Sequence, residues 1–513
     1  MEYKNSPYFH VAHARDLVGV DKFIFRLLEI LPGFLAWFTL VGLVILAATL
    51  PVWAAIFIII FDLFWLFKTI HLSFYHYYNW RRMKHNIKKD WAGILSKTKH
   101  EHVHHLILLP FYQESREVIE ETIIALVNTE YNKSKFLLVI AAEERAGIKH
   151  HKIAEDLREK YKDVFGDVIV TIHPQNISGE ISGKGPNITY AAEEARKRIL
   201  DFRSIRYEDV LVSAFDIDTI VWPKYFSCLT WYFLNAEFPQ KSSYQPVPLY
   251  NNNIWHTNFI SRVAATSSTF WQMIQQERPE KLVTFSSHTI PFKPLYEVGY
   301  WQKNMISDDS RIYWNLYMAN DGDWRTIPIS YPVSMDANLA PTVFQTLKNI
   351  YKQHRRWMWG VENIPYMLFG FIKNKKIPLR DKFRRAFTQI EGFWSLATNP
   401  IIILFLGWLP VVIGGSIFRN TVVSYNLPVV TRIIMTIAMF GLILSAIISL
   451  SFLPPMPEKY KHRRFRWIGS VVQWIFVPFT IIFFASIPGI DAQTRLMFGK
   501  YFGKFWVTPK HRK

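Results

Sequence analysis

Two pairs of aspartates are the side chains of this sequence best suited to chemistry. Asp216 and Asp218 come directly after an apolar run, residues 210–215. Alternate residues of an extended segment point the same way, so the two carboxylates can face one ligand. Because Mg²⁺ is commonly bound through carboxylates and substrate phosphates, this pair suits a metal–diphosphate substrate. An ordinary surface turn is an equally good interpretation of an isolated Asp-x-Asp.

The second pair, Asp308 and Asp309, follows Ser307 at the start of a helix predicted over residues 310–317. Adjacent carboxylates repel each other, so one of them can have a raised pKa that suits a general base. Acidic side chains also stabilise the amino terminus of a helix. Taken without any other information, this capping role is the stronger interpretation.

A third group comprises Gln353, Arg356 and Trp357 on a predicted helix. Residues three and four apart lie on one helix face. A guanidinium matches phosphate oxygens in a bidentate manner, and a flat indole suits the face of a sugar. The alternative is an interfacial helix whose Trp and Arg side chains lie at the level of lipid headgroups. That alternative is strongest for Trp359 and Tyr366.

Lys184 lies between two glycines in a segment that at first resembles a phosphate loop. The first and last glycines are too close together for that motif, and Gly185 stands where Ser or Thr would coordinate Mg²⁺. Two interpretations of the segment have equal weight. It is a flexible loop that brings Lys184 near a nucleotide, or it is a plain connector into a helix.

Short apolar runs alternate with helical segments around these residues, which predicts a parallel sheet covered on both faces. In such sheets ligands bind beyond the carboxyl ends of the strands, where this sequence has Tyr112, Gln113, Glu114, Glu143 and Glu144 as well as the first aspartate pair. The predicted strands are residues 106–110, 136–142, 168–172 and 210–215, and the predicted helices are residues 115–128, 150–163 and 188–202.

Four stretches of membrane-spanning length contain no charged residue. The first is predicted to be a hairpin of helices near residues 32–50 and 52–70, which puts Asp62 at membrane depth. A functional role for Asp62 is possible in principle, but a partner within the helix bundle is the favoured explanation. The four stretches are residues 30–61, 392–418, 433–457 and 467–490.

The chain has a formal net charge of +19, although 50% of its residues are hydrophobic. Residues 81–100, 373–385 and 454–513 carry net charges of +6, +6 and +9 and flank the apolar stretches. Basic flanks mark the cytoplasmic side of a membrane and attract anionic lipids. With three C-terminal spans, the loop at residues 458–466 falls inside and the basic tail falls outside, against this rule. A re-entrant last stretch or a miscounted span would remove the conflict.

Other classes of protein fit less well. Nucleic-acid binding is disfavoured, because no basic stripe with interleaved aromatic residues lies on the central block. A disulfide scaffold is excluded, because Cys228 is the single cysteine. The histidines at residues 100–105 and 150–151 match no metal-site spacing, so solvated positions are expected for them.

The motifs together resemble the membrane-integrated family 2 glycosyltransferases, the group that contains cellulose, chitin and hyaluronan synthases. The resemblance implies a GT-A-like (Rossmann-like) α/β cytoplasmic domain inserted between transmembrane helices. This chain has Glu143 where the family usually has Asp, and Ser307-Asp308 where it has Thr-Glu. The motifs that carry the resemblance are Pro110-x-x-x-Glu114, Lys184, Asp216-x-Asp218, Asp308-Asp309 and Gln353-x-x-Arg356-Trp357.

Five regions are predicted from the resemblance and the apolar stretches. They are an N-terminal amphipathic segment and transmembrane hairpin (residues 1–80), a GT-A-like domain (81–345), interfacial helices (346–388), C-terminal transmembrane helices (389–490) and a basic amphipathic tail (491–513).

The resemblance also implies an inverting, metal-dependent transfer of a sugar from a nucleotide-diphosphate donor to a growing glycan or glycolipid, in contact with membrane lipids. Asp309 would be the catalytic base, and Asp216 and Asp218 would hold Mg²⁺ or Mn²⁺. The donor would be bound by Pro110, Glu114, Glu143, Lys184, Asp216 and Arg356, and the acceptor by Asp308, Gln353 and Trp357.

Two alternatives remain open at this point. One is transfer of a single sugar onto a polyprenyl phosphate or another lipid. The other is a membrane transporter or scaffold with a degenerate transferase domain. The acidic motifs argue against the second alternative, because a non-catalytic domain has no need of them.

Overall fold

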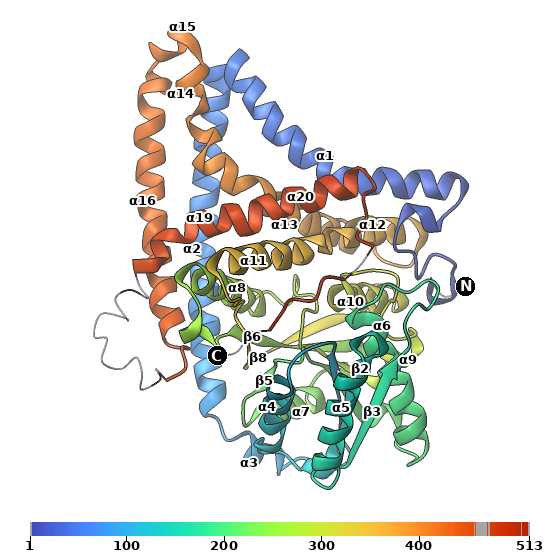
Figure 1. The fold of residues 1–513 in the computed structure, drawn as a ribbon. Helices are drawn as coiled ribbons and strands as arrows, with labels where there is room; N and C mark the ends of the chain where they lie inside the picture. Colours follow the sequence, from blue (N-terminus) through green and yellow to red (C-terminus); the bar gives the residue numbers. More distant parts are fainter. Residues whose placement is uncertain (1–2, 456, 458–468, 470–471, 504, 511–513) are drawn as a thin grey trace.

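The structure is a computed structural model that describes residues 3–455, 457, 469, 472–503 and 505–510. In Figure 1 an α/β block lies at the bottom, a layer of helices covers it, and steep apolar helices rise above that layer. The predicted α/β class is therefore confirmed. The predicted position of the loop at residues 458–466 lies outside the described residues.

One eight-stranded sheet forms the block, with the strand order β3-β2-β1-β4-β7-β6-β8-β5. Its first half is parallel, as predicted, because β1 pairs with β2 and β4 and β2 pairs with β3 in parallel register. These strands are β1 (His104–Phe111), β2 (Phe136–Glu143), β3 (Asp167–His173) and β4 (Val210–Ala214).

The second half of the sheet is mixed, and none of its strands was predicted from the sequence. The short strand β7 (Thr289–Pro291) is antiparallel to both of its neighbours, β4 and β6 (Ser242–Tyr250). Beyond it, β6 is parallel to β8 (Arg325–Met335), and β5 (Ile220–Val221) is antiparallel to β8. Strands β5 and β7 have only two and three residues, so neither forms an apolar run as long as those of the first half.

Alternate side chains of the parallel strands enter different cores. Leu106 and Leu108 pack with α6 (Lys184–Ala195), whereas Ile107 and Leu109 pack with α4 (Arg116–Val127) and α5 (Ile148–Tyr161). The sheet is thus covered on both faces, as its nearly continuous apolar strands predict. The predicted helix at residues 188–202 begins earlier, at Lys184, and continues as a π-helix over Arg196–Asp201.

The remaining helices of the block and of the layer above it come from the second half of the chain and from short connections. They are α3 (Trp91–Leu95), α7 (Tyr225–Leu234), α8 (Phe259–Gln276), α9 (Phe292–Glu297), α10 (Asp308–Ala319), α11 (Val343–Met358), the 3₁₀-helix η9 (Trp359–Glu362) and α12 (Asn363–Lys373).

The predicted N-terminal hairpin is present as α1 (Gly19–Thr49) and α2 (Pro51–Lys88), and both helices are longer than predicted. Asp62 of α2 accepts a hydrogen bond of 3.0 Å from Thr431 Oγ1, so the predicted partner within the bundle is confirmed. The other apolar helices are α13 (Leu379–Leu404), α14 (Leu409–Ile413), α15 (Gly415–Arg419), α16 (Val422–Leu450), α19 (Val477–Ile481) and α20 (Ile487–Met497).

Three helices in the described part of the chain are long and apolar enough to cross a membrane: Gly19–Thr49, Pro51–Lys88 and Gln473–Met497. A fourth is added if Leu379–Leu404 and Leu406–Ile413, which meet at a bend of 48°, form one span. Five spans were predicted from the apolar stretches. The fifth predicted span falls on α16, of which Val422–Ala438 counts only as a shorter apolar helix among the described residues.

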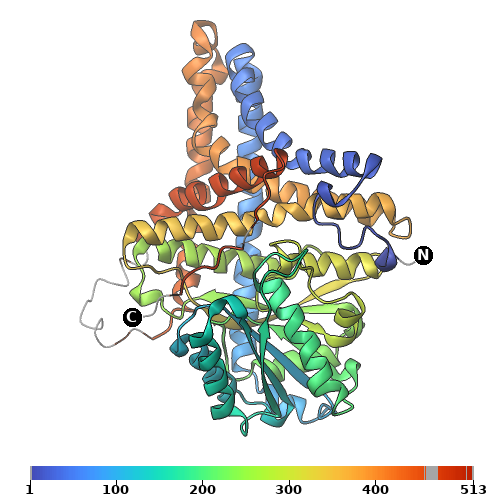
Figure 2. The ribbon, with the colours of Figure 1, turned by 45° about the vertical axis from the view of Figure 1, so that its right-hand side comes forward.

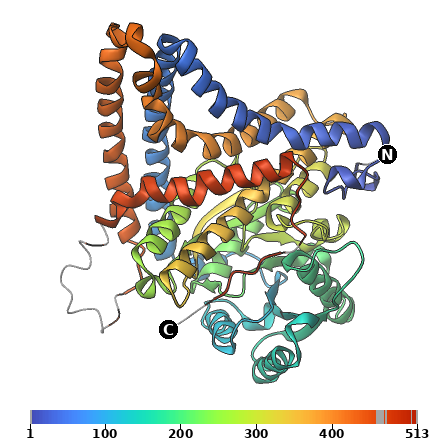
Figure 3. The ribbon, with the colours of Figure 1, turned by 45° about the horizontal axis from the view of Figure 1, so that its top comes forward.

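Both ends of the chain return to the α/β block. The N-terminal segment folds back beneath the start of α1 (Figure 2), and Phe9 and Val11 join the same core as α6 and α10. The tail after α20 descends onto the block (Figure 3), where Lys510 contacts Asp218. The described part of the basic tail therefore contacts the block, which agrees with a re-entrant last stretch or a miscounted span.

Candidate active site

Lys184 joins the two acidic pairs. Its Nζ donates to Asp216 Oδ1 at 2.7 Å and to Asp309 Oδ1 at 2.9 Å. The lysine begins α6, Asp216 follows β4 and Asp309 lies in the first turn of α10, so three separate elements meet here. Burial alone would lower the pKa of Lys184, but the carboxylates of Asp216, Asp309 and Asp308 outweigh burial and raise it. A plain connector would not explain these contacts.

The two glycines beside Lys184 allow this close packing. A Cβ on Gly183 would lie 2.7 Å from Phe505 Cβ, and a Cβ on Gly185 would lie 3.1 Å from Asp308 Cβ. Contacts below about 3.0 Å require backbone or ring atoms to move in a densely packed region. Crowding around Lys184, rather than a phosphate loop, therefore explains the glycines.

The first acidic pair combines one partly exposed and one buried carboxylate. Asp216 also accepts from Ser286 Oγ at 2.7 Å. Burial would raise the pKa of Asp216, but the adjacent Lys184 ammonium lowers it well below its usual range. Asp218 is fully buried, and its Oδ2 accepts from the backbone N–H of Asp336 at 2.9 Å and from Lys510 Nζ at 2.6 Å. The other oxygen of Asp218, Oδ1, has no hydrogen-bond partner.

The carboxylate oxygens of Asp216 and Asp218 fit a divalent cation. The unpartnered Asp218 Oδ1 and the partly exposed Asp216 carboxylate are hard oxygen ligands. In the described residues no group of three or more His, Cys, Asp or Glu side chains could hold a metal ion, so water or substrate oxygens would have to complete its coordination. Lys510 supplies positive charge at Asp218, and it would have to leave before a metal took that place.

Asp336 is a third carboxylate of this site, and sequence analysis missed it. Asn252 Nδ2 donates to Asp336 Oδ1 and to the backbone oxygen of Asp218, both at 3.0 Å. Burial and the nearby Asp218 charge raise the pKa of Asp336 to about 7. Asp336 directly follows β8, so the rule that ligands bind at strand ends would have identified it if that strand had been predicted.

The second acidic pair lies in the first turn of α10, where the helix terminus favours acidic side chains. Asp308 is buried, and its Oδ2 has no hydrogen-bond partner. Burial and the adjacent Asp309 charge raise the pKa of Asp308 to about 7, in the direction predicted for one member of the pair. Ser307 does not cap the helix, because its hydroxyl donates to Glu362 instead.

The third group is brought to the same region by α11. Gln353 and Trp357 line a small cavity together with Tyr250 and Asp336. The Arg356 guanidinium lies 4.4 Å from the centre of the Phe505 ring in the C-terminal tail, and its Nε is buried without a hydrogen-bond partner. A buried guanidinium nitrogen without a partner is a group that an anionic ligand could satisfy.

Trp359 and Tyr366 are not interfacial anchors, so that prediction is wrong. Both side chains are buried. Trp359 Nε1 donates to Glu362 Oε2 at 2.8 Å, and Tyr366 OH donates to the backbone oxygen of Phe9 at 2.9 Å. The N-terminal segment covers Tyr366, and this contact between distant parts of the chain is not visible in the local sequence.

The remaining predicted donor residues lie at the ends of β1 and β2. Glu114 Oε2 accepts from the backbone N–H of Tyr112 at 2.7 Å, and burial raises the pKa of Glu114. Glu143 forms a bidentate pair with Arg145 at 2.5 and 3.0 Å, and this arginine lies 4.3 Å from the centre of the Tyr112 ring. Pro110 lies within β1, as the predicted strand at residues 106–110 has it.

The histidine clusters form no metal site in the described residues. His105 is fully buried, with a ring nitrogen 2.9 Å from Thr230 Oγ1, so the expected solvated position is wrong for this residue. Burial lowers the pKa of His105 to about 3. The aromatic core beneath β1 therefore contains a neutral imidazole.

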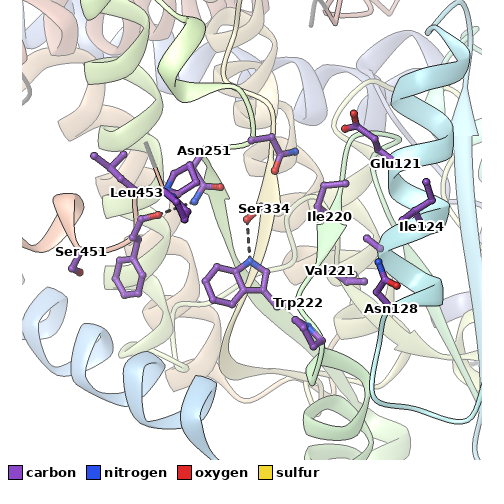
Figure 4. A pocket seen from close by; sticks show the side chains of 16 residues that line it. Glu121, Ile124, Asn128, Ile220, Val221, Trp222, Asn251, Ser334, Ser451 and Leu453 are labelled. Atoms are coloured by element: carbon purple, nitrogen blue, oxygen red, sulfur yellow. Dashed lines mark hydrogen bonds between the residues drawn. The ribbon is translucent and has the colours of Figure 1, made fainter. Parts of the chain in front are cut away.

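A larger cavity, of about 610 Å³, is lined by residues of α4, of β5 and of the segment that follows α16 (Figure 4). Trp222 is one of the lining residues, and its indole Nε1 donates to Ser334 Oγ at 3.0 Å. Asn252 is shared between this cavity and the Asp218–Asp336 network. The residues that line the cavity include none of the predicted site residues.

Comparisons with known proteins add family information to this geometry. Residues 211–487, more than half of the chain, match the family described as Glycosyl transferase family group 2. The Poly-beta-1,6-N-acetyl-D-glucosamine synthase of Staphylococcus aureus (strain COL) is 30% identical over 113 residues, which are 22% of this chain. The match covers 24% of that protein, so the chain spans about a quarter of the length of this curated relative.

Solved structures similar to this one include a mannosyltransferase and another protein in complex with a nucleotide sugar. A mannosyltransferase, PcManGT from Pyrobaculum calidifontis in complex with GDP-Man and Mn2+, is 13% identical with a TM-score of 0.38, over 81% of this chain and 97% of that one. S. aureus TarS 1-349 in complex with UDP-GlcNAc is 10% identical with a TM-score of 0.36, over 68% of this chain and 91% of that one.

Proposed function

Because the chain belongs to glycosyl transferase family group 2, as its motifs predicted, we propose that it is a membrane-bound inverting transferase. It moves a sugar from a nucleotide-diphosphate donor to a growing glycan or glycolipid. One observation carries this proposal: Lys184 contacts both Asp216 and Asp309. The same ammonium group therefore joins Asp216, which is suited to a metal–diphosphate group, to Asp309, which is suited to proton transfer.

The donor would lie along the carboxyl ends of β1, β2 and β4. Pro110, Glu114 and the Glu143–Arg145 pair would bind the nucleoside part of the donor at this edge. Asp216 and Asp218 would hold Mg²⁺ or Mn²⁺, which supplies charge stabilisation for the departing diphosphate. Lys184 and Arg356 would add positive charge near the same phosphates.

Asp309 would accept the proton of the attacking hydroxyl group. The hydroxyl oxygen then bonds to the anomeric carbon, while the bond from that carbon to the diphosphate oxygen breaks and the diphosphate leaves with the electron pair. Attack from the face opposite the leaving group inverts the anomeric centre. Gln353, Trp357 and Asp308 would bind the acceptor, since the first two line a cavity on the α11 side of the site.

The apolar helices support a membrane location. Three helices of the described residues have the length and composition of a membrane span. Both ends of the chain contact the catalytic block, which favours an arrangement with both termini and the block on one side. We assign that side to the cytoplasm, because the basic segments flank the apolar helices there.

The test is a nucleotide-release assay on the full chain in lipid nanodiscs. A panel of UDP- and GDP-sugars is offered with Mg²⁺, with Mn²⁺ or with EDTA. We expect release with one donor class and only when a metal is added. The absence of release with every donor would favour the transporter or scaffold alternative. The size of the products after long incubation separates polymer synthesis from transfer of one sugar onto a lipid.

A further inference from the structure

Glu362 is a buried carboxylate that no motif singled out, and it holds the residue before the second acidic pair. Its Oε1 accepts from Ser307 N at 3.0 Å and from Ser307 Oγ at 2.7 Å. Its Oε2 accepts from Trp359 Nε1 at 2.8 Å and lies 3.6 Å from His13 Nε2. Only 1% of the Glu362 side chain is exposed, so its charge depends on these partners.

Asn363 holds the other side of the same pair. Its Nδ2 donates to Ser310 Oγ at 2.9 Å, and its Oδ1 accepts from Arg311 Nε at 2.7 Å. Glu362 and Asn363 therefore contact residues 307, 310 and 311, on both sides of Asp308 and Asp309. Two consecutive residues thus fix the first turn of α10 from one direction.

The N-terminal segment completes this arrangement. Arg311 Nη1 donates to the backbone oxygen of Val11 at 3.1 Å, and the Arg311 guanidinium lies 4.0 Å from the centre of the Tyr366 ring. Tyr366 OH in turn donates to the Phe9 backbone oxygen. Residues before the first apolar helix therefore support the position of the catalytic pair.

Ser307 shows that this contact is more than ordinary helix capping. A serine at this position commonly accepts from the first N–H groups of the helix and so stabilises it. Here the hydroxyl turns away from α10 and donates to Glu362. A long-range hydrogen bond to η9 thus replaces the local capping hydrogen bond.

We propose that Glu362, assisted by Asn363, is a positioning residue that sets Asp309 against the acceptor hydroxyl, an inference that rests on the transfer reaction proposed above. The Asp309 carboxylate is fixed from one side by Lys184 of α6, and Ser307, two residues before Asp309, is held from the other side by Glu362 of η9. Because η9 directly follows α11, the same segment carries Gln353 and Trp357. We call the contacts of Glu362 and Asn363 with residues 307, 310 and 311 the clamp. This clamp therefore sets the distance between the base and the acceptor site.

The experiment compares Glu362→Ala, Glu362→Gln and Ser307→Ala in the full chain, with the donor that the panel identifies. The matched control is Glu277→Gln, since Glu277 is also a nearly buried glutamate but pairs with Arg82 (3.1 Å) and Asn79 (3.2 Å), away from α10. Measured quantities are kcat, the donor KM, the ratio of donor hydrolysis to transfer, and thermal unfolding.

We expect Glu362→Ala to lower kcat about 100-fold, the effect of a displacement of about 1 Å, with the donor KM changed less than about twofold. Hydrolysis relative to transfer should rise, because water needs less exact placement than the acceptor. Glu362→Gln keeps an oxygen for Ser307 but cannot accept from Trp359, and Ser307→Ala loses one hydrogen bond. Each should cost about 3- to 10-fold in kcat, the effect of one hydrogen bond.

The inference is overturned if Glu362→Ala retains the wild-type kcat. It is also overturned if Glu362→Ala lowers kcat, donor binding and the unfolding temperature together, to the same extent as Glu277→Gln does, because the loss would then be a general loss of structure. If Glu362→Ala does not fold, the two milder variants decide between these outcomes. An inactive wild-type chain would instead overturn the proposed function, so the two failures are distinguishable.

Discussion

The two acidic pairs of the site have the same arrangement of carboxylates but differ in their cationic partners. In each pair one carboxylate bonds to Lys184, Asp216 in the first and Asp309 in the second, and the other is buried with one oxygen unpartnered. Asp218 also has the Lys510 ammonium as a partner. Within the described part of the chain, no cationic side chain bonds to Asp308.

This difference separates two kinds of chemistry. A buried carboxylate bonded to an ammonium group is held in the charged form that binds a cation, whereas a buried carboxylate without such a partner tends to keep its proton. Burial and the adjacent Asp309 charge raise the pKa of Asp308 to about 7, and no bonded ammonium group offsets them. The first pair is therefore suited to a metal and the second to proton transfer, although both consist of two aspartates.

The largest effect should come from Asp309→Asn, which removes the base but leaves the metal pair intact. Transfer should fall by about 100- to 10,000-fold, the usual contribution of a general base. Donor binding should survive, and it can be measured by titration with the nucleotide. Asp381→Asn, which removes a partly exposed aspartate paired with Arg384, is the matched control. Transfer near the wild-type rate in Asp309→Asn would contradict the assignment of the pairs.

Asp218→Asn should have a smaller effect, because Asp216 and the substrate phosphates still bind the metal. We expect the concentration of Mn²⁺ that gives half-maximal activity to rise by about 10-fold or more, since an ionised ligand and its charge are lost. Metal titrations of activity and of nucleotide binding measure this shift. An unchanged metal dependence would show that the first pair does not hold the cation.

The surroundings of the first pair were more predictable than those of the second, for a physical reason. Strands β1 to β4 and their helices follow each other in the chain, and each has its own apolar pattern. Asp216 and Asp218 come directly after such a strand, so the rule for parallel sheets placed them correctly at its end.

Long-range contacts set the remaining geometry. Lys510 reaches Asp218 from 292 positions away, and Val11 meets Arg311 from 300 positions away. Such contacts depend on how the apolar helices pack, and no motif at either end announces them. The second pair was therefore identified as a pair, but its clamp at Glu362 was not.

Lys510→Met tests the charge balance of the first pair directly. The substitution removes an ammonium that competes with a metal for Asp218, so metal should bind about 3- to 10-fold more tightly in the absence of nucleotide. Calorimetry or a Mn²⁺ binding isotherm measures the affinity. Lys375→Met, at an exposed position near the end of α12, serves as the control. Weaker metal binding in Lys510→Met would mean that Lys510 supports the metal site rather than competing with it.

The smallest change in activity, less than about 10-fold, is expected for Asp308→Asn, because Asp309 remains. Its clearest effect is on the pH dependence of stability. The pKa of Asp308 rises from 3.8 in the unfolded chain to about 7 in the folded one, so between these values the folded state holds a proton that the unfolded state has released. Stability therefore falls as pH rises through this window, with a maximum slope of about 1.4 kcal/mol per pH unit, and levels off above about pH 7. Asparagine carries no such proton, so thermal unfolding between pH 4.5 and 8 should show a smaller decline in Asp308→Asn than in the wild type. Equal slopes in the two proteins would mean that Asp308 is already ionised in the folded state and that both pairs are balanced in the same way.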